Sequence, residues 1–152
     1  MVERFLGRQV KRIDAKGRVS IPAPFRAVLA AERFDGLFCL RSLTHPAVDA
    51  GGAALLASIE TTLARHDPFS TEHTELAALL FGQGDGPTLD TEGRMVMPDW
   101  IREATGITTE VLFVGLGTRF QMWAPEHFAA QEARARATVS RLLGTPVGEN
   151  GR

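Results

Sequence analysis

The sequence predicts an α+β fold of two pseudo-symmetric, β-rich modules in one chain, with connecting and C-terminal helices. The stretches IDAKGRVSIPAPFR (residues 13–26) and LDTEGRMVMPDWIR (residues 89–102) align without a gap at an offset of 76. An apolar, strand-like segment follows each stretch, so the order strand, turn, strand, helix, strand occurs twice. Five positions are identical in the two copies: Asp14/Asp90, Gly17/Gly93, Arg18/Arg94, Pro22/Pro98 and Arg26/Arg102.

In the first copy, an aspartate and a glycine indicate a tight turn between two short strands. Asp14 can accept hydrogen bonds from nearby backbone N–H groups, and Gly17 tolerates a positive φ angle. Pro22 predicts a helix start, because the first turn of a helix needs no backbone N–H. The expected elements are a strand ending at Ile13, a turn over 14–17, a strand over 18–21, a helix over about 23–31 and a strand over 37–40.

The second copy repeats this order, and Gly106 is expected to end its helix. Between the copies, apolar residues at helical spacing predict two connecting helices, while the glycines of residues 82–86 suggest a flexible linker. A C-terminal helix carries a stripe of Phe128, Ala135, Val139 and Leu142 that should pack on something. These elements are expected at 94–97, about 99–104, 111–114 and 120–123 in the second copy, within 51–66 and at 72–81 in the connector, and at 125–143, before a loose tail over 144–152.

The domain organisation follows from the repeat and from the helical segments that separate and follow its copies. We expect a first module, a helical connector, a second module, and a C-terminal helix with a tail. The corresponding boundaries are residues 7–51, 52–82, 83–127 and 128–152.

Charge is distributed unevenly along the chain, although the net charge is only −1. Residues 1–26 contain seven basic and two acidic side chains, a net charge of +5, whereas residues 70–103 contain two basic and seven acidic ones, a net charge of −5. Such segregation indicates a polyanionic partner for the basic segment. Its basic residues are Arg4, Arg8, Lys11, Arg12, Lys16, Arg18 and Arg26.

Double-stranded DNA is the polyanion that this pattern favours, because clustered Lys and Arg release condensed counterions from phosphates. A two-stranded ribbon also fits the major groove, where Arg and Lys can reach guanine. Glu92 replaces Lys16 in the second copy, so we expect the first copy to read DNA and the second to serve packing and assembly. The expected DNA-binding residues are Arg8, Lys11, Arg12, Lys16 and Arg18, and the expected turn-forming residues are Asp14, Gly17, Asp90, Gly93 and Arg94. A merely solvated charged face is the alternative.

The sequence offers no catalytic or cofactor-binding constellation, so we expect no enzyme activity, no cofactor, no metal and no small-molecule substrate. Cys39 is the only cysteine, and the four histidines lack metal-ligand spacing with it. No apolar run is long enough to cross a bilayer, and the first residues lack the apolar stretch of a secretion signal. We therefore expect a cytoplasmic protein with no membrane partner.

The motif Asp-x-x-Gly-Arg, followed by a short strand and Pro, resembles the AbrB-type swapped-hairpin module. Two such copies, together with Phe5-Leu-Gly7, Val111-Leu-Phe-Val-Gly115 and Arg119-Phe-Gln-Met-Trp123, resemble the MraZ family over most of residues 5–128. Gln121 departs from this pattern, in which a glutamate is usual. The resemblance implies ring-forming, nucleoid-associated transcriptional regulators that bind repeated DNA upstream of their own division and cell-wall operon.

Three alternatives remain open at this point. A scaffold ring could use the basic face to bind acidic proteins, without preference for particular DNA. An antitoxin-like AbrB module could neutralise a toxin through residues 125–143. A small hydrolase is disfavoured because no activated nucleophile or metal set is evident.

Overall fold

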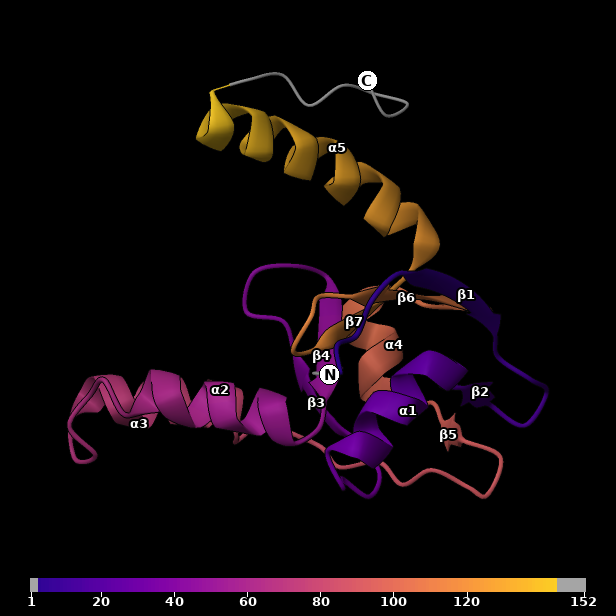
Figure 1. The fold of residues 1–152 in the computed structure, drawn as a ribbon, viewed down its shortest axis with the longest axis horizontal. Helices are drawn as coiled ribbons and strands as arrows, with labels where there is room; N and C mark the ends of the chain where they lie inside the picture. Colours follow the sequence, from indigo (N-terminus) through magenta and orange to yellow (C-terminus); the bar gives the residue numbers. More distant parts are fainter. Residues whose placement is uncertain (1–2, 145–152) are drawn as a thin grey trace.

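A computed structural model describes residues 3–144 and shows a mixed α+β fold, as predicted (Figure 1). Its main sheet has five antiparallel strands in the order β1-β6-β7-β4-β3, and a separate two-stranded sheet pairs β2 with β5. The predicted tail lies outside the described residues from 145 onward. The elements are β1 (Arg8–Arg12), β2 (Arg18–Ser20), α1 (Ala23–Ala31), β3 (Phe38–Arg41), β4 (Ala47–Gly51), α2 (Ala53–Leu63), α3 (Thr71–Leu80), β5 (Arg94–Val96), α4 (Asp99–Thr105), β6 (Glu110–Gly115), β7 (Phe120–Trp123) and α5 (Pro125–Leu143).

Local sequence signals place most of these helices. Pro22 and Pro98 precede α1 and α4, and Gly106 ends α4 with a φ of 76°. Ser70 caps α3, because its side-chain oxygen accepts a hydrogen bond from the His73 N–H at 3.1 Å. The predicted helices therefore form within one or two residues of the expected bounds, except that α2 occupies only 53–63 of the predicted region 51–66.

The short strands of the two copies pair with each other. Arg18 lies opposite Val96, Val19 opposite Met95, and Ser20 opposite Arg94. Val19 and Met95 are equivalent positions of the repeat, so exchanging the copies reproduces the same register. Strand β1 of the first copy likewise pairs with β6 of the second.

The centre of the main sheet shows the same exchange. Hairpins β3-β4 and β6-β7 lie side by side in the sheet, and β4 pairs with β7 so that Asp49 lies opposite Gln121. On either side of that pair, Val48 faces Met122 and Ala50 faces Phe120. Each copy thus obtains strand partners from the other.

Strand β4 is the element that the sequence fails to predict. Its residues, AVDAG, include one good strand former, Val48, among alanine, aspartate and glycine, which are depleted in strands. They form a strand because β4 lies between β3 and β7, and its Ala47, Val48 and Ala50 are fully buried. Tertiary context therefore overrides local preference here.

The sequence suggests a flexible linker for the glycine-rich segment before the second repeat. The structure instead shows a segment that is hydrogen-bonded to the sheet. Asp85 and Cys39 exchange backbone hydrogen bonds of 2.8 Å, and the Leu37 N–H donates to the Pro87 carbonyl at 3.2 Å. Gly84 lies so close to Phe38 that a Cβ atom would approach its ring to 2.7 Å. Residues 85–87 therefore pair with the outer edge of β3, which is the edge of the sheet opposite to β1.

The main core lies between the sheet and helices α1 and α4, while α5 lies on the other side of the sheet (Figure 1). Phe25 of α1 packs against Phe5 and Phe120, with ring centroids 5.4 and 4.8 Å apart. Helices α2 and α3 form a hairpin that projects from this body. None of the helices in residues 3–144 combines the length and apolar character that crossing a bilayer requires.

Candidate nucleic-acid interface

The turn of the first copy is organised by one carboxylate. Asp14 Oδ1 accepts hydrogen bonds from the Lys16 and Arg18 N–H groups at 2.9 and 2.8 Å, and Oδ2 accepts from Arg18 Nε at 2.9 Å. Gly17 has a φ of 79°, a conformation that favours glycine. The turn therefore fixes the direction in which the Arg18 side chain leaves β2.

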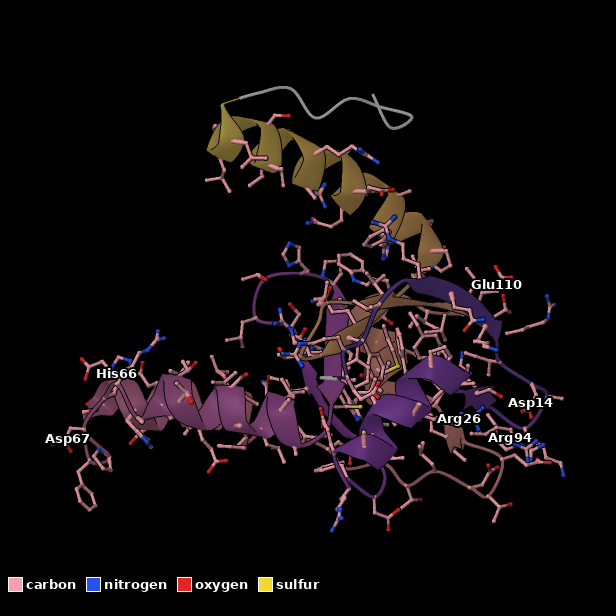
Figure 2. All side chains as sticks on the ribbon, in the orientation of Figure 1. Asp14, Arg26, His66, Asp67, Arg94 and Glu110 are labelled. Atoms are coloured by element: carbon pink, nitrogen blue, oxygen red, sulfur yellow. The ribbon has the colours of Figure 1, made fainter. Side chains whose placement is uncertain are left out.

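The turn of the second copy repeats these bonds. Asp90 Oδ1 accepts from the Glu92 and Arg94 N–H groups at 2.9 Å each, and Oδ2 accepts from Arg94 Nε at 2.9 Å. Gly93 has a φ of 77°. Both turns lie at the same end of the molecule, where Figure 2 labels Asp14 and Arg94 close together. The geometry predicted for the duplicated motif is present in both copies.

These contacts favour the ionised aspartates. The backbone N–H of Arg18 makes the largest contribution to lowering the pKa of Asp14 below its ordinary value of 3.8, and the Arg18 side chain adds to it. The backbone N–H of Arg94 lowers the pKa of Asp90 in the same way. The hydrogen bond to Asp90 is the main cause that raises the pKa of Arg94. Both turns thus remain ion-paired at neutral pH.

The residue between aspartate and arginine makes the two turns differ. Glu92 Oε2 lies 2.6 Å from Arg94 Nη2, so Arg94 is bound to two carboxylates. Lys16 occupies the equivalent position of the first turn. Within residues 3–144, the terminal nitrogens of Arg18 form no hydrogen bond or ion pair. They can therefore bind an external anion without breaking the Asp14 contact.

Arg26, which sequence reasoning did not place at either turn, lies beneath the second one. Its Nη1 donates to the Glu92 carbonyl at 3.3 Å, and its buried Nε has no hydrogen-bond partner. A Cβ atom on Gly93 would come within 2.3 Å of Arg26 Cδ, whereas one on Gly17 would contact nothing within 4 Å. The Arg26 side chain therefore packs against the second turn at Gly93, whereas no side chain of the described residues packs against the first turn at Gly17. The identity of Arg26 and Arg102 in the repeat was the only available signal.

The five predicted DNA-binding residues do not share one surface. Residues alternate between faces along a strand, so Arg8 and Arg12 lie on one face of β1 and Lys11 on the other. Arg8 forms a 2.6 Å ion pair with Glu132 of α5 and lies over the Phe128 ring, 4.7 Å from its centroid. That ion pair lowers the pKa of Glu132. Arg8 thus connects β1 to α5 rather than extending from the turn.

We define the other predicted residues as the basic edge, although Lys11 and Arg12 lie on opposite faces of β1; its members are Lys11, Arg12, Lys16 and Arg18. Arg12 and Lys16 are exposed, and the other two are partly buried. In the described part of the chain, the ammonium and guanidinium groups of Lys11, Arg12 and Lys16 make no ion pair. Strand β1 and the first turn therefore present cations that are available to an external polyanion.

A metal site is not evident among residues 3–144, where no three His, Cys, Asp or Glu side chains are grouped to hold an ion. Cys39 is buried in the core, which raises the pKa of its thiol. The fold and turns define the class of the chain. It is a duplicated α+β protein in which each copy carries an Asp–Arg turn on strands paired with the other copy.

Comparisons with known proteins identify the family. A family model described as "MraZ protein, putative antitoxin-like" matches residues 80–143. The chain is 46% identical to the transcriptional regulator MraZ of Azorhizobium caulinodans, over 99% of this chain and 98% of that protein. It is 45% identical to the Xanthobacter autotrophicus regulator of that name, over 93% and 90%, and 46% identical to that of Rhizobium rhizogenes, over 89% and 92%.

The chain belongs to the MraZ family. This confirms the family inferred from the repeated motif. The relatives carry the name of a regulator, which agrees with the prediction that the chain is not an enzyme.

Proposed function

We propose that this chain is a DNA-binding transcriptional regulator that contacts DNA through the basic edge of its first copy. The observation that carries the proposal is the contrast between the two arginines: Arg94 is bound by Glu92, whereas the end of Arg18 is available. The ordered turn holds Arg18 before DNA arrives, so less side-chain freedom is lost on binding. The names of the relatives support regulation of transcription.

Arg8 is the weakest member of the predicted DNA-binding set. Its ion pair with Glu132 would have to break before Arg8 could contact a phosphate. We therefore assign direct contacts to Lys11, Arg12, Lys16 and Arg18, and give Arg8 the role of anchoring α5.

The two copies act as a fused pair of AbrB-type swapped-hairpin modules, with residues 7–51 and 83–127 as modules, 52–82 as connector, and 128–152 as C-terminal helix and tail. The exchanged strand pairing supports this assignment, because β2 and β5 find each other across the copies. A single chain then supplies what two chains supply in a one-module protein.

Several chains act together on DNA in this proposal. Each chain offers one small basic edge, so its affinity for a single DNA element is modest. A ring of chains on repeated elements upstream of its own division and cell-wall operon gains affinity through effective concentration. The protein accordingly works in the cytoplasm, associated with the nucleoid.

A salt series tests the proposal directly. The purified protein is titrated with its own upstream DNA and with a scrambled sequence of equal length, at several salt concentrations. Affinity for the upstream DNA should exceed that for the scrambled DNA, and the log–log salt slope should steepen by about 0.9 for each phosphate contact. Equal affinity for both DNAs, at every salt concentration, would contradict sequence-specific regulation and favour a scaffold that binds polyanions.

A second candidate function is toxin neutralisation, because the matching family is described as "putative antitoxin-like". Helix α5 would bind the toxin, since none of its residues is buried. A small protein that co-purifies with the intact chain, and is lost when the exposed face of α5 is changed, would support this candidate over DNA binding alone.

A further inference from the structure

We propose that the turn between α2 and α3 of one chain docks into the space beneath α5 of a second copy of this chain. This inference rests on the self-assembly proposed above and names the two surfaces that meet. We call residues 66–70 the Phe69 turn, and the space between α5 and the outer face of the sheet the α5 cavity.

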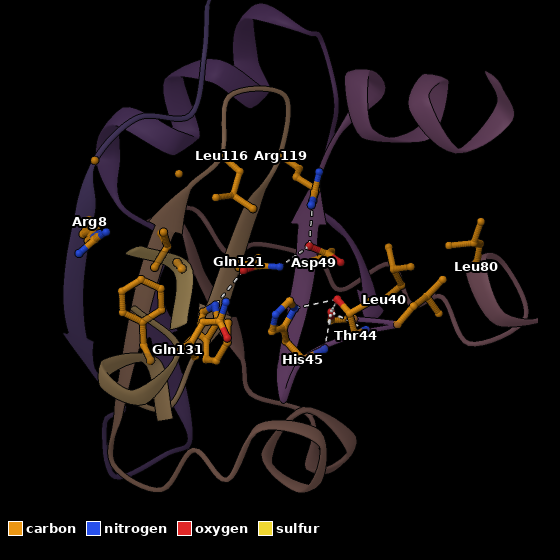
Figure 3. Close-up of a pocket in the computed structure, with 18 residues that line it drawn as sticks. Arg8, Leu40, Thr44, His45, Asp49, Leu80, Leu116, Arg119, Gln121 and Gln131 are labelled. Carbon is orange, nitrogen blue, oxygen red and sulfur yellow. Dashed lines mark hydrogen bonds and ion pairs between the residues drawn. The ribbon is translucent and has the colours of Figure 1, made fainter. Parts of the chain in front are cut away.

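The α5 cavity is large and only partly polar. Its volume is about 600 Å³, within the range of pockets that enclose drug-sized groups (Figure 3). Leu40, Leu43 and Leu116 form part of its apolar wall. A smaller hollow of about 240 Å³ under α5 shares Arg8 and Ala135 with it. The cavity can therefore accept an apolar side chain with its neighbours.

Helix α5 is attached to the body mainly through its first half. Phe128 packs edge-on against Trp123, with centroids 5.3 Å apart, and Glu132 pairs with Arg8. Further along, Val139, Leu142 and Leu143 are 40, 76 and 67% exposed. The sequence predicts that the stripe of Phe128, Ala135, Val139 and Leu142 packs on something. Phe128 does so, whereas Val139 and Leu142 stay exposed in the described part of the chain.

The Phe69 turn offers the complementary apolar group. The Phe69 side chain is 97% exposed, at the far end of the α2–α3 hairpin, where Figure 2 labels His66 and Asp67. Its backbone is nevertheless ordered: Asp67 Oδ1 accepts from the Phe69 N–H at 2.8 Å, and Ser70 Oγ donates to the Asp67 carbonyl at 2.7 Å. Because the backbone that carries it is ordered, the ring loses less entropy on entering a pocket than it would on a flexible loop, so it suits an interface anchor.

Charge complementarity identifies the partner as a second copy. Residues 60–75, around the Phe69 turn, contain four acidic side chains and one arginine, a net charge of −3. Residues 133–143 of α5 contain three arginines and no acid, a net charge of +3. Opposite charges on two surfaces of one chain favour contact between copies and disfavour like-with-like contact.

The contact must form between chains. Among the described residues that line the α5 cavity, none comes from the Phe69 turn. In Figure 1 the far end of the α2–α3 hairpin also lies well apart from α5, although both project toward the left of the view. The turn of one chain therefore meets the cavity of another.

Two single substitutions in the full chain test the docking. Phe69→Ala removes the ring but no contact within the chain, and Ala135→Trp fills the cavity from α5. Ala133→Trp is the matched control, because Ala133 is exposed while Ala135 lines the cavity. Sedimentation velocity should show that each test variant raises the concentration for half-assembly at least about 30-fold, as expected for an interface anchor. The control should assemble like the wild type.

Mixing the two test variants sharpens the result. Phe69→Ala retains an open cavity and Ala135→Trp retains the ring. The mixture should therefore form one-to-one pairs at a concentration at which each variant alone is monomeric. Normal assembly of both single variants, or a mixture that remains monomeric, would overturn the docking.

The same experiment separates this inference from the proposed function. A wild-type chain that sediments as a monomer at every concentration would overturn both self-assembly and the docking. Wild-type assembly that persists in both variants would overturn only the docking surfaces. DNA binding of the first copy is measured independently and stands or falls on its own.

Discussion

The two turns of the repeat have the same hydrogen bonds but differ in whether their arginine can bind an external anion. Asp14 and Asp90 each hold two backbone N–H groups and one arginine Nε at nearly identical distances. In the second turn Glu92 also binds the end of Arg94, whereas in the first Lys16 adds a cation beside Arg18. The comparison shows that Asp, Gly and Arg determine the shape of the turn, while the residue before Gly determines its charge.

The largest effect is expected from removing the available arginine. Arg18→Ala should weaken binding to upstream DNA about 10- to 100-fold, because it removes a positioned cation from the basic edge. Arg94→Ala should change the affinity by less than about threefold, since Glu92 already neutralises that side chain. Fluorescence anisotropy with both variants at one salt concentration measures the ratio. Equal losses in folded, assembled variants would break the distinction between the copies.

Reversing the charge of the residue before Gly93 should make the second turn resemble the first in its capacity to bind an anion. Glu92→Lys releases Arg94 and adds a cation, so affinity for DNA should rise about fivefold to tenfold. The log–log salt slope should steepen by an amount that corresponds to about one or two additional phosphate contacts. Lys16→Glu is the matched control, and it should weaken binding by a similar factor. An unchanged salt slope for Glu92→Lys would show that the second turn faces away from the DNA.

Alanine at the two glycines should distinguish the second turn, against which Arg26 packs, from the first. Gly17→Ala places a side chain at positive φ with free space around it and should destabilise the protein by about 1 kcal/mol. Gly93→Ala should destabilise it more, because the new Cβ would overlap Arg26. Thermal unfolding should show a fall in Tm of roughly 2–4 °C per kcal/mol. Identical shifts would mean that Arg26 moves aside without loss.

The smallest effect is expected at acid pH and should be alike in the two turns. Both aspartates have a pKa below 3.8 in the folded chain, so their stabilisation is complete above that value and is lost as the pH falls through the lowered pKa. Carboxyl chemical shifts should follow both titrations, with each midpoint below 3.8. A midpoint at or above 3.8 for one aspartate would show that its turn is not held by these hydrogen bonds.

Local patterns in the sequence predicted most elements of the fold. The repeat, the prolines before α1 and α4, and Gly106 after α4 each act over a few residues, so their consequences are visible without tertiary structure. Strand β4 could not be found in this way, because Ala47 and Ala50 adopt strand geometry through burial between two neighbouring strands.

The sequence predicts the candidate site only as a list of residues, and their arrangement in space depends on the fold. The substitution of Lys16 by Glu92 was visible in the repeat, and the structure shows the ion pair that results. The attachment of Arg8 to Glu132 joins residues 124 positions apart, so no local pattern could reveal it. Arg26 beneath Gly93 is a similar case, since their contact depends on how the copies pair.

The exchanged pairing of β2 with β5 has a further consequence for how such proteins diversify. In a homodimer of identical polypeptides, every substitution occurs in both halves at once, so the two sides cannot acquire different tasks. Covalent tandem linkage removes that restriction and makes the association of the halves independent of dilution. Substitutions can then adapt one copy to bind a ligand while the other copy keeps the residues that maintain the fold.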